Sequence, residues 1–211
     1  MMAKGQPDFN QVFDSQRTFG ALLKATARPG KIVRLPETRL NSPWNLNPYP
    51  ILILLSLLDH EVGFEVLDEE SITQDLDGLR DYIALKTRSN IVPCHAADFI
   101  LVYGGSSKGR IIEAQRGSLA YPDLGATLLY DLEAIGGDPE DGLTLQLTGP
   151  GIVDVEHLQV RGLKDDEVRS IMETRQEFPM GIDVILADNQ GNVAALPRST
   201  EISCEVVPWD M

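Results

Sequence analysis

The residue types best suited to holding an anion occur in a short segment that follows an apolar strand. The segment "YGGSSKGR", residues 103–110, combines glycines, serines and Lys108 directly after the apolar run "FILV". Backbone N–H groups of such a loop can form a nest that holds a phosphate. The spacing matches neither the P-loop pattern nor the dinucleotide-binding fingerprint. We therefore favour a solvent-exposed loop, with a phosphate cradle as the alternative.

A second candidate is the segment "LPRST", residues 196–200, which places Arg198 beside the hydroxyls of Ser199 and Thr200. A guanidinium with two hydroxyls can grip an oxyanion. The alternative is a surface turn in which Arg198 pairs with an acid such as Glu201, a contact that contributes little. Lys108, Arg198, Ser199 and Thr200 are thus candidate anion-binding or interface residues.

Asp183 interrupts an apolar strand, "IDVILA", that follows a Pro-Met-Gly bend. A buried charge is costly unless it is hydrogen-bonded or paired. Asp183 is therefore either a catalytic or binding group or a structural tie. We favour the tie, in which the carboxylate accepts hydrogen bonds from backbone N–H groups of the bend or pairs with a nearby arginine.

The chain offers few residues for other catalytic chemistry. Its histidines are His60, His95 and His157, and neither an H-E-x-x-H nor a C-x-x-C pattern is present. Among its lysines, Lys108 alone directly follows a strand, as a pyridoxal-phosphate lysine would, and no acidic partner for the cofactor ring can be assigned. No nucleophile elbow occurs. We predict no catalytic, cofactor-binding or metal-binding residue.

The composition describes an acidic, globular chain. Its 211 residues suit one domain over residues 1–211, and its net charge of -14 argues against nucleic-acid binding. The longest apolar run, residues 51–58, is too short to cross a bilayer, and no apolar signal core precedes it. Cys94 and Cys204 form no disulfide framework. We expect a cytoplasmic protein without a membrane partner.

Helices and strands alternate in the first half of the sequence. We predict a helix that begins at Asp14 or Ser15 and ends at Pro29-Gly30, with one buried face. That face would comprise Phe19, Leu22, Leu23 and Thr26. A short strand "KIVRLP" follows, then a helix capped by Asn47, a strand "EVGFEVLD", a helix over residues 76–87 and a buried strand "DFILVYGG". This order indicates an α/β fold.

Strands dominate the second half. The segments "GATLLYDL", "LTLQLTGPGI" and "EHLQVRGL" read as strands, with "GGDPEDG" as a turn between the first two. We predict a helix from Asp165 or Asp166 to about Gln176. Its inward residues would be Val168, Ile171 and Met172, and its outward residues Arg169 and Arg175. A hairpin "IDVILA"–"VAALP" and a last strand "EISCEVV" complete one mixed sheet flanked by helices.

The glycines of "LTGPGI", residues 147–152, stand at the end of a strand. We expect them to adopt positive φ angles or to allow another backbone to pack closely. The alternative is a ligand-facing loop.

Three stretches together resemble a known family. They are "FDSQRTFGALLKATARPG", "LTGPGI" and "FPMGIDVILADNQGNVAALPRST", residues 13–30, 147–152 and 178–200. In this order they are similar to the H subunit of the bacterial carbon-phosphorus lyase system of phosphonate metabolism. The resemblance covers both ends of the chain.

The resemblance implies a three-layer α/β sandwich with a mixed sheet, similar to the pyridoxal-phosphate-dependent transferase fold but without its cofactor site. It also implies a homodimer that joins the G, I and J subunits in a core complex. That complex transfers an alkylphosphonate to ribose C1 of ATP and releases adenine. Nucleosidase-like chemistry is placed on the I subunit, and later carbon-phosphorus bond cleavage on the J subunit.

The residue patterns and the family resemblance both predict an accessory, non-catalytic subunit that is inactive alone. The apolar stripe of the first helix and the strand edges of the hairpin are candidate partner surfaces. The alternative is a stand-alone small-molecule enzyme or a phosphate- or phosphonate-binding protein that uses Lys108 and Arg198.

Overall fold

The strands form two sheets, whereas the sequence pattern predicted one. The computed structural model describes residues 9–69, 71–137 and 142–205. Within these residues, a seven-stranded sheet has the order β1-β10-β9-β5-β4-β2-β3, and a four-stranded sheet the order β11-β7-β8-β6. The large sheet comprises β1 (Val33–Arg34), β2 (Gly63–Leu67), β3 (Asn90–Ile91), β4 (Phe99–Val102), β5 (Thr127–Leu132), β9 (Asp183–Asp188) and β10 (Asn192–Leu196). The small sheet comprises β6 (Ala134–Ile135), β7 (Leu143–Thr148), β8 (Glu156–Arg161) and β11 (Glu201–Glu205).

The large sheet is mixed, as predicted. Strands β3, β2, β4, β5 and β9 are parallel to one another. Strand β10 pairs antiparallel with β9, and β1 pairs antiparallel with β10. The predicted hairpin is confirmed, with Leu196 of β10 opposite Val184 of β9. The parallel strands therefore place their carboxyl ends at one edge of the sheet and their amino ends at the other.

The small sheet arises because its strands bury only one face. Along β7 and β8, buried residues alternate with partly exposed ones, as in an antiparallel sheet with one solvated side. In contrast, β4 and β9 are almost continuously apolar and buried, as expected for a sheet covered on both faces. The last strand, β11, pairs with β7 and so leaves the large sheet.

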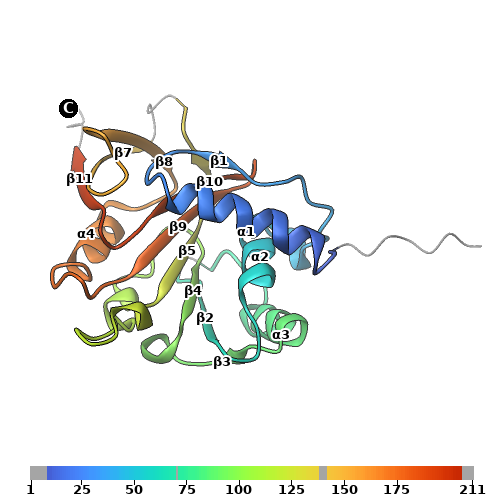
Figure 1. Cartoon of the computed structure of the whole chain (residues 1–211). Coiled ribbons are helices and arrows are strands. Elements are labelled where there is room, and N and C mark those ends of the chain that lie inside the picture. Colours follow the sequence, from blue (N-terminus) through green and yellow to red (C-terminus); the bar gives the residue numbers. More distant parts are fainter. Residues whose placement is uncertain (1–8, 70, 138–141, 206–211) are drawn as a thin grey trace, which may run out of the picture.

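Helices cover one face of the large sheet, and the small sheet with one helix covers the other (Figure 1). On the first face lie α1 (Phe13–Thr26), α2 (Pro48–Leu57) and α3 (Leu76–Thr87). On the second lies α4 (Asp165–Glu173). Short 3-10 turns occur at Pro43–Asn45, Cys94–Ala96, Arg110–Glu113 and Pro122–Leu124. The α/β layering agrees with the prediction.

The helix α2 connects the helical layer to the carboxyl edge of the sheet. It begins at Pro48, and the side-chain oxygen of Asn47 accepts a hydrogen bond from the Tyr49 N–H at 3.1 Å, as predicted for a cap. The amide nitrogen of Asn47 donates to Asp131 Oδ1 at 2.7 Å. One carboxamide therefore ties the start of a buried helix to the end of the central strand β5.

The start and face of α1 differ from the prediction. The helix begins at Phe13, because Asn10, not Asp14 or Ser15, accepts hydrogen bonds from the N–H groups of Val12 and Phe13. Its buried face is formed by Thr18, Ala21, Leu22 and Ala25. Phe19 and Leu23 are 48% and 54% exposed. The small residues Ala21 and Ala25 let the helix pack closely, and the apolar stripe beside them is left uncovered.

The face predicted for α4 is partly wrong. Val168 and Ile171 are buried as expected, but Met172 is 40% exposed. The helix ends at Glu173, before Gln176. Arg175 therefore lies outside the helix, and its side chain points inward and not outward as predicted. Glu167 is fully buried, which the acidic sequence of this helix did not indicate. The predicted "GGDPEDG" turn lies largely outside the described residues.

In the described residues, every helix is too short or too polar to traverse a lipid bilayer.

Candidate functional site

The loop after β4 is buried, contrary to the predicted solvent-exposed loop. Ser106 and Ser107 are 3% and 0% exposed. The backbone N–H and the hydroxyl of Ser107 donate to Glu167 Oε2 at 2.9 and 3.0 Å. The N–H and hydroxyl of Ser107 are therefore used by a carboxylate of the chain itself and are not available to a phosphate.

Glu167 is held from a second side by Tyr130 of β5. The Tyr130 hydroxyl donates to Glu167 Oε1 at 2.6 Å. Burial raises the pKa of Glu167, while Tyr130 and Ser107 oppose that rise through their hydrogen bonds. Burial, together with the neighbouring carboxylate, also raises the pKa of Tyr130, so the phenol remains a donor. These contacts join α4 to β5 and to the loop after β4.

Lys108, a predicted anion-binding residue, extends from this loop toward the segment after β2. Its ammonium group donates to the Glu69 carbonyl at 2.6 Å, and Arg110 pairs with the Glu69 carboxylate at 2.9 Å. Lys108 follows the carboxyl end of β4, whereas Arg198 follows β10 at the opposite edge of the sheet. The structure therefore does not bring Lys108 together with Arg198.

Arg198 is bound to Asp183, the acid singled out in the sequence, and not to Glu201. Asp183 Oδ1 accepts hydrogen bonds from the Arg198 backbone N–H at 2.7 Å and from its Nε at 3.2 Å. Oδ2 pairs with Nη2 of the same guanidinium. Arg198 also donates to the carbonyls of Pro122 and Gly125. This pair links the segment after β10 to the start of β9 at the amino edge of the sheet, as a structural tie would.

Arg198, Ser199 and Thr200 share a cavity of about 510 Å³ with a residue that the sequence did not indicate, Arg175. The Arg175 guanidinium donates to the carbonyls of Leu196, Ile182 and Thr200 at 2.6, 3.2 and 3.2 Å. Burial lowers the pKa of Arg175 to about 10. Asp183 is paired with Arg198, and Glu201 also lines the cavity, so two arginines and two acids lie in or beside it.

The Thr200 hydroxyl is buried at the edge of this cavity and has no hydrogen-bond partner among the described residues. A hydroxyl beside a buried guanidinium can donate to an oxyanion. The predicted site residues on this edge of the sheet therefore do gather, together with Arg175, whose guanidinium is hydrogen-bonded to backbone carbonyls.

The three stretches that carry the family resemblance meet beside this cavity. Gly149 has φ +128°, and a Cβ there would lie 2.7 Å from the Ser199 carbonyl oxygen. Gly151 has φ +88°, and a Cβ there would lie 2.9 Å from Pro29 Cδ. Both expected roles of these glycines, positive φ and close packing, are confirmed. The motif residues thus hold segments of the chain together.

A second polar cavity, of about 550 Å³, lies at the carboxyl edge of the sheet. Asp131, at the end of β5, is part of its wall, and Asn47 provides one hydrogen bond to it at 2.7 Å. Burial raises the pKa of Asp131 to about 6, with a further rise from Asp188 and an opposing effect from Asn47. The sequence analysis did not single out this acid.

Asp188, in the same region, is an acid whose two carboxylate oxygens are both hydrogen-bonded. It is 1% exposed, and its two oxygens accept hydrogen bonds from the N–H groups of Ile135, Gln190 and Asn192 and from the Asn192 amide. Asp131 receives one such bond within the described residues. The difference identifies Asp188 as a turn anchor and Asp131 as an incompletely bonded carboxylate.

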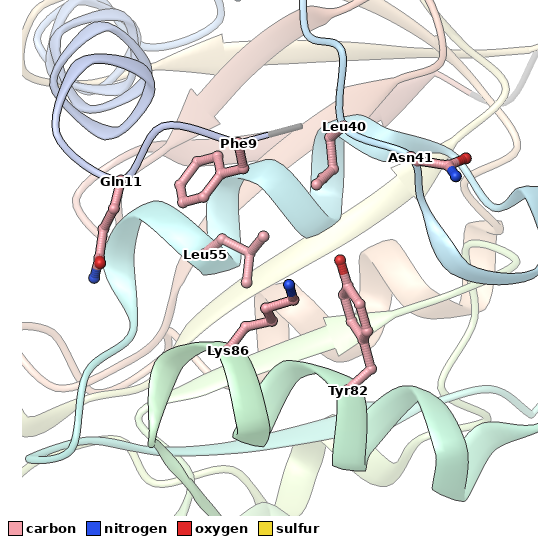
Figure 2. Close-up of a pocket in the computed structure, with 7 residues that line it drawn as sticks. All are labelled: Phe9, Gln11, Leu40, Asn41, Leu55, Tyr82 and Lys86. Carbon is pink, nitrogen blue, oxygen red and sulfur yellow. The ribbon is translucent and has the colours of Figure 1, made fainter. Parts of the chain in front are cut away.

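Other parts of the structure offer less chemistry. A cavity of about 260 Å³ lies between α2 and α3, where Lys86 Nζ stands 5.7 Å from the centre of the Tyr82 ring (Figure 2). Leu55 is part of its wall, and none of the described residues that line it is an acid. Among the described residues, no three histidine, cysteine or acidic side chains gather as metal ligands would. Burial raises the pKa of the Cys94 thiol to about 11, which makes it unreactive.

Comparison with known proteins gives a match over nearly the whole chain. Residues 7–203 match the family described as bacterial phosphonate metabolism protein (PhnH). A putative C-P lyase subunit protein, HtxG, of Stutzerimonas stutzeri is 33% identical over 190 residues, which is 89% of this chain and 85% of the relative. The alpha-D-ribose 1-methylphosphonate 5-triphosphate synthase subunit PhnH of Rhizobium meliloti (strain 1021) is 29% identical over 196 residues, 92% of each chain.

Replacing Asp183 by Asn tests the tie at the amino edge. We expect the free energy of unfolding to fall by roughly 2 kcal/mol, because the part-buried Arg198 guanidinium loses its counter-charge. Urea unfolding at neutral pH measures the change. The matched control is Asp165→Asn, which breaks the exposed pair with Arg169 and should cost less than about 0.5 kcal/mol. Equal effects of the two variants would contradict a structural tie.

Replacing Asp131 by Asn should stabilise the protein in a pH-dependent way. The pKa of Asp131 is about 6 in the folded chain against an ordinary value of 3.8, so the folded state prefers the protonated form. Wild-type stability therefore decreases as pH rises between these values and stays lower above them. We expect the variant to gain roughly 2 kcal/mol at pH 8 and nothing below about pH 4. Thermal unfolding across this range, with Asp123→Asn as control, checks it. A gain that does not vary with pH would refute the expectation.

Proposed function

The chain belongs to the bacterial phosphonate metabolism protein (PhnH) family, and from this premise we propose that it is a subunit of a carbon-phosphorus lyase complex. In that complex it supports transfer of an alkylphosphonate to ribose C1 of ATP with release of adenine. The observation that carries the proposal is the match over residues 7–203. The names of both relatives, a C-P lyase subunit and a synthase subunit, agree with it.

The proposal includes the finer expectations of the sequence analysis. The chain would pair with itself and with the G, I and J subunits, in the cytoplasm, and its fold would resemble that of the pyridoxal-phosphate-dependent transferases. A single domain is supported by the apolar cluster that continues from β4 and β5 of the large sheet to β7 and β8 of the small one.

An accessory role is supported by how the chain uses its charged residues. Arg198 is neutralised by Asp183, and Glu167 fills the loop that could have held a phosphate. These groups maintain the fold and are not arranged as a nucleophile with a base. Most of the chemistry of the complex would then be carried out by its other subunits.

The uncovered stripe of α1 is the surface that we propose for partner contact. Phe19 and Leu23 are about half exposed and line a mainly apolar cavity of about 230 Å³, together with Leu57 and Phe99. Exposed apolar side chains of this kind are typical of protein interfaces. The stripe lies beside the amino edge of the sheet, where Asp183 also lines the cavity.

A reconstituted complex tests the proposed function. We expect the purified chain alone to show no turnover of ATP with methylphosphonate, and the G, I and J subunits without it to lose product formation. Adding the chain back should restore product, measured by phosphorus NMR. The control is the addition of heat-denatured chain. Turnover by the chain alone, or undiminished product without it, would refute the proposal.

A second candidate function, binding of a phosphonate or phosphate by the chain itself, is favoured by the cavity around Arg175. Its buried guanidinium is surrounded by carbonyls, and the neighbouring Thr200 hydroxyl is without a partner in the described residues. An anion in this cavity would accept hydrogen bonds from the Thr200 hydroxyl and be attracted by the Arg175 guanidinium.

Calorimetry with methylphosphonate tests this second candidate. We expect binding to weaken at least about tenfold in Thr200→Val, which keeps the side-chain shape and removes a hydroxyl worth roughly 1.5 kcal/mol to an anion. Arg198→Ala should weaken it as well, whereas Arg169→Ala, an exposed arginine of α4, should not. Absence of binding, or binding that Lys108→Ala abolishes and Thr200→Val does not, would rule out this cavity.

A further inference from the structure

The cavity that contains Asp131 is built at the carboxyl edge of the parallel strands. Its wall comes from the ends of β4, β5 and β9 and from the segment that leads into α2. In open α/β sheets, ligands bind outside the carboxyl ends of the strands, next to a point where successive connections diverge.

Such a divergence occurs between β2 and β4. The connection from β2 runs through α3 to the edge strand β3, whereas the connection from β4 runs to β5 on the other side. The cavity begins beside this point, with Gly104 after β4 and Ile72 after β2 in its wall. Its position is therefore that of a ligand site, although the loop after β4 is itself filled by Glu167.

The polar groups in the wall are mostly hydrogen-bond acceptors and carboxamides. Asp131 and Glu133 provide carboxylates, Asn45, Asn47 and Asn189 provide amides, and Lys164 provides the one cation among the lining residues. A ligand with several neutral donors, such as the hydroxyls of a sugar, matches this set.

We propose that this cavity binds the ribose of a ribose-containing ligand, with two neighbouring hydroxyls donating to the carboxylate of Asp131. The choice of ribose among sugars rests on the proposed function, since the synthase subunit to which the chain is similar is named for a ribose product. Carboxylates that accept hydrogen bonds from ribose hydroxyls at this edge are a known solution in dinucleotide-binding folds. Asp131 is a binding residue here, and no bond of the ligand is broken.

The incomplete bonding of Asp131 is the observation that carries the proposal. Asn47 provides one hydrogen bond to Oδ1, so acceptor positions remain for a ligand. Asp131 is partly exposed and lines the cavity, so these remaining acceptor positions are open to a molecule that enters it.

The charges around Asp131 determine how binding depends on pH. Asp188 raises the pKa of Asp131, and the Asn47 amide lowers it. Asp131 and Asp68 in turn help raise the pKa of Tyr103, after burial, so that this phenol stays neutral. Glu133 and Lys164 complete the ionisable groups of the wall. Because the ligand hydroxyls need a carboxylate as acceptor, binding should strengthen as pH rises through the pKa of Asp131.

Calorimetric titration of the intact chain with ATP and with 2′,3′-dideoxy-ATP tests the proposal. The two nucleotides carry the same base and triphosphate and differ in the two hydroxyls. We expect ATP to bind at least about tenfold more tightly, a difference of one or two hydrogen bonds to a charged acceptor. Asp131→Asn should remove this preference, and Asn189→Ala, at the cavity rim, should reduce it. The control Asp123→Asn, an exposed acid at the opposite edge, should preserve it.

Each outcome distinguishes this proposal from the proposed function. Equal binding of the two nucleotides, no binding of either, or an unchanged preference in Asp131→Asn would overturn the ribose site. None of these results bears on whether the chain is needed by the complex, which the reconstitution with and without the chain decides. Ribose 5-phosphate serves as a second probe, and its binding should likewise strengthen between about pH 5 and pH 7.5.

Discussion

The buried carboxylate of Glu167 is the interaction on which the arrangement of the layers depends. It lies on α4, yet its hydrogen-bond donors come from the loop after β4 and from Tyr130 of β5. A fully buried acid must be bonded on both oxygens, or its desolvation cost would oppose folding. Because these donors exist only when α4 packs on the large sheet, the acid selects that packing and shapes the glycine-serine loop around itself.

The two edges of the large sheet differ for electrostatic reasons. At the amino edge, Asp183 and Arg198 neutralise each other, and Arg198 also donates to the carbonyls of Pro122 and Gly125. The residues that carry the family resemblance lie at that edge, and their packing gives a structural reason for their identities. At the carboxyl edge, Asp131 is left with a single amide partner and a neighbouring acid. The structure therefore ties Asp183 at one edge and leaves acceptor capacity on Asp131 at the other.

Much of the local structure could be predicted, since it depends on residues close together in the sequence. The cap of α2 at Asn47, the bounds of α3 and the β9–β10 hairpin each follow from short patterns. The separate sheet could also have been found, because "LTLQLT" and "EHLQVR" alternate whereas "FILV" does not. Asp131 was missed although it interrupts the apolar segment "TLLYDL" as Asp183 interrupts "IDVILA". Glu167 gave no signal, because acids are common in the first turn of a helix.

The sequence by itself determined the family, the α/β class and the structural reason for the motif glycines, because periodicity, caps and turn residues act locally. It could not decide which acids are satisfied. Asp183, Asp188, Glu167 and Asp131 all stand in or beside apolar segments, and their partners come from other elements. Whether a carboxylate is a tie or a free acceptor depends on how many donors reach its two oxygens. That number is set by tertiary packing, which brings distant N–H and hydroxyl groups within hydrogen-bond distance.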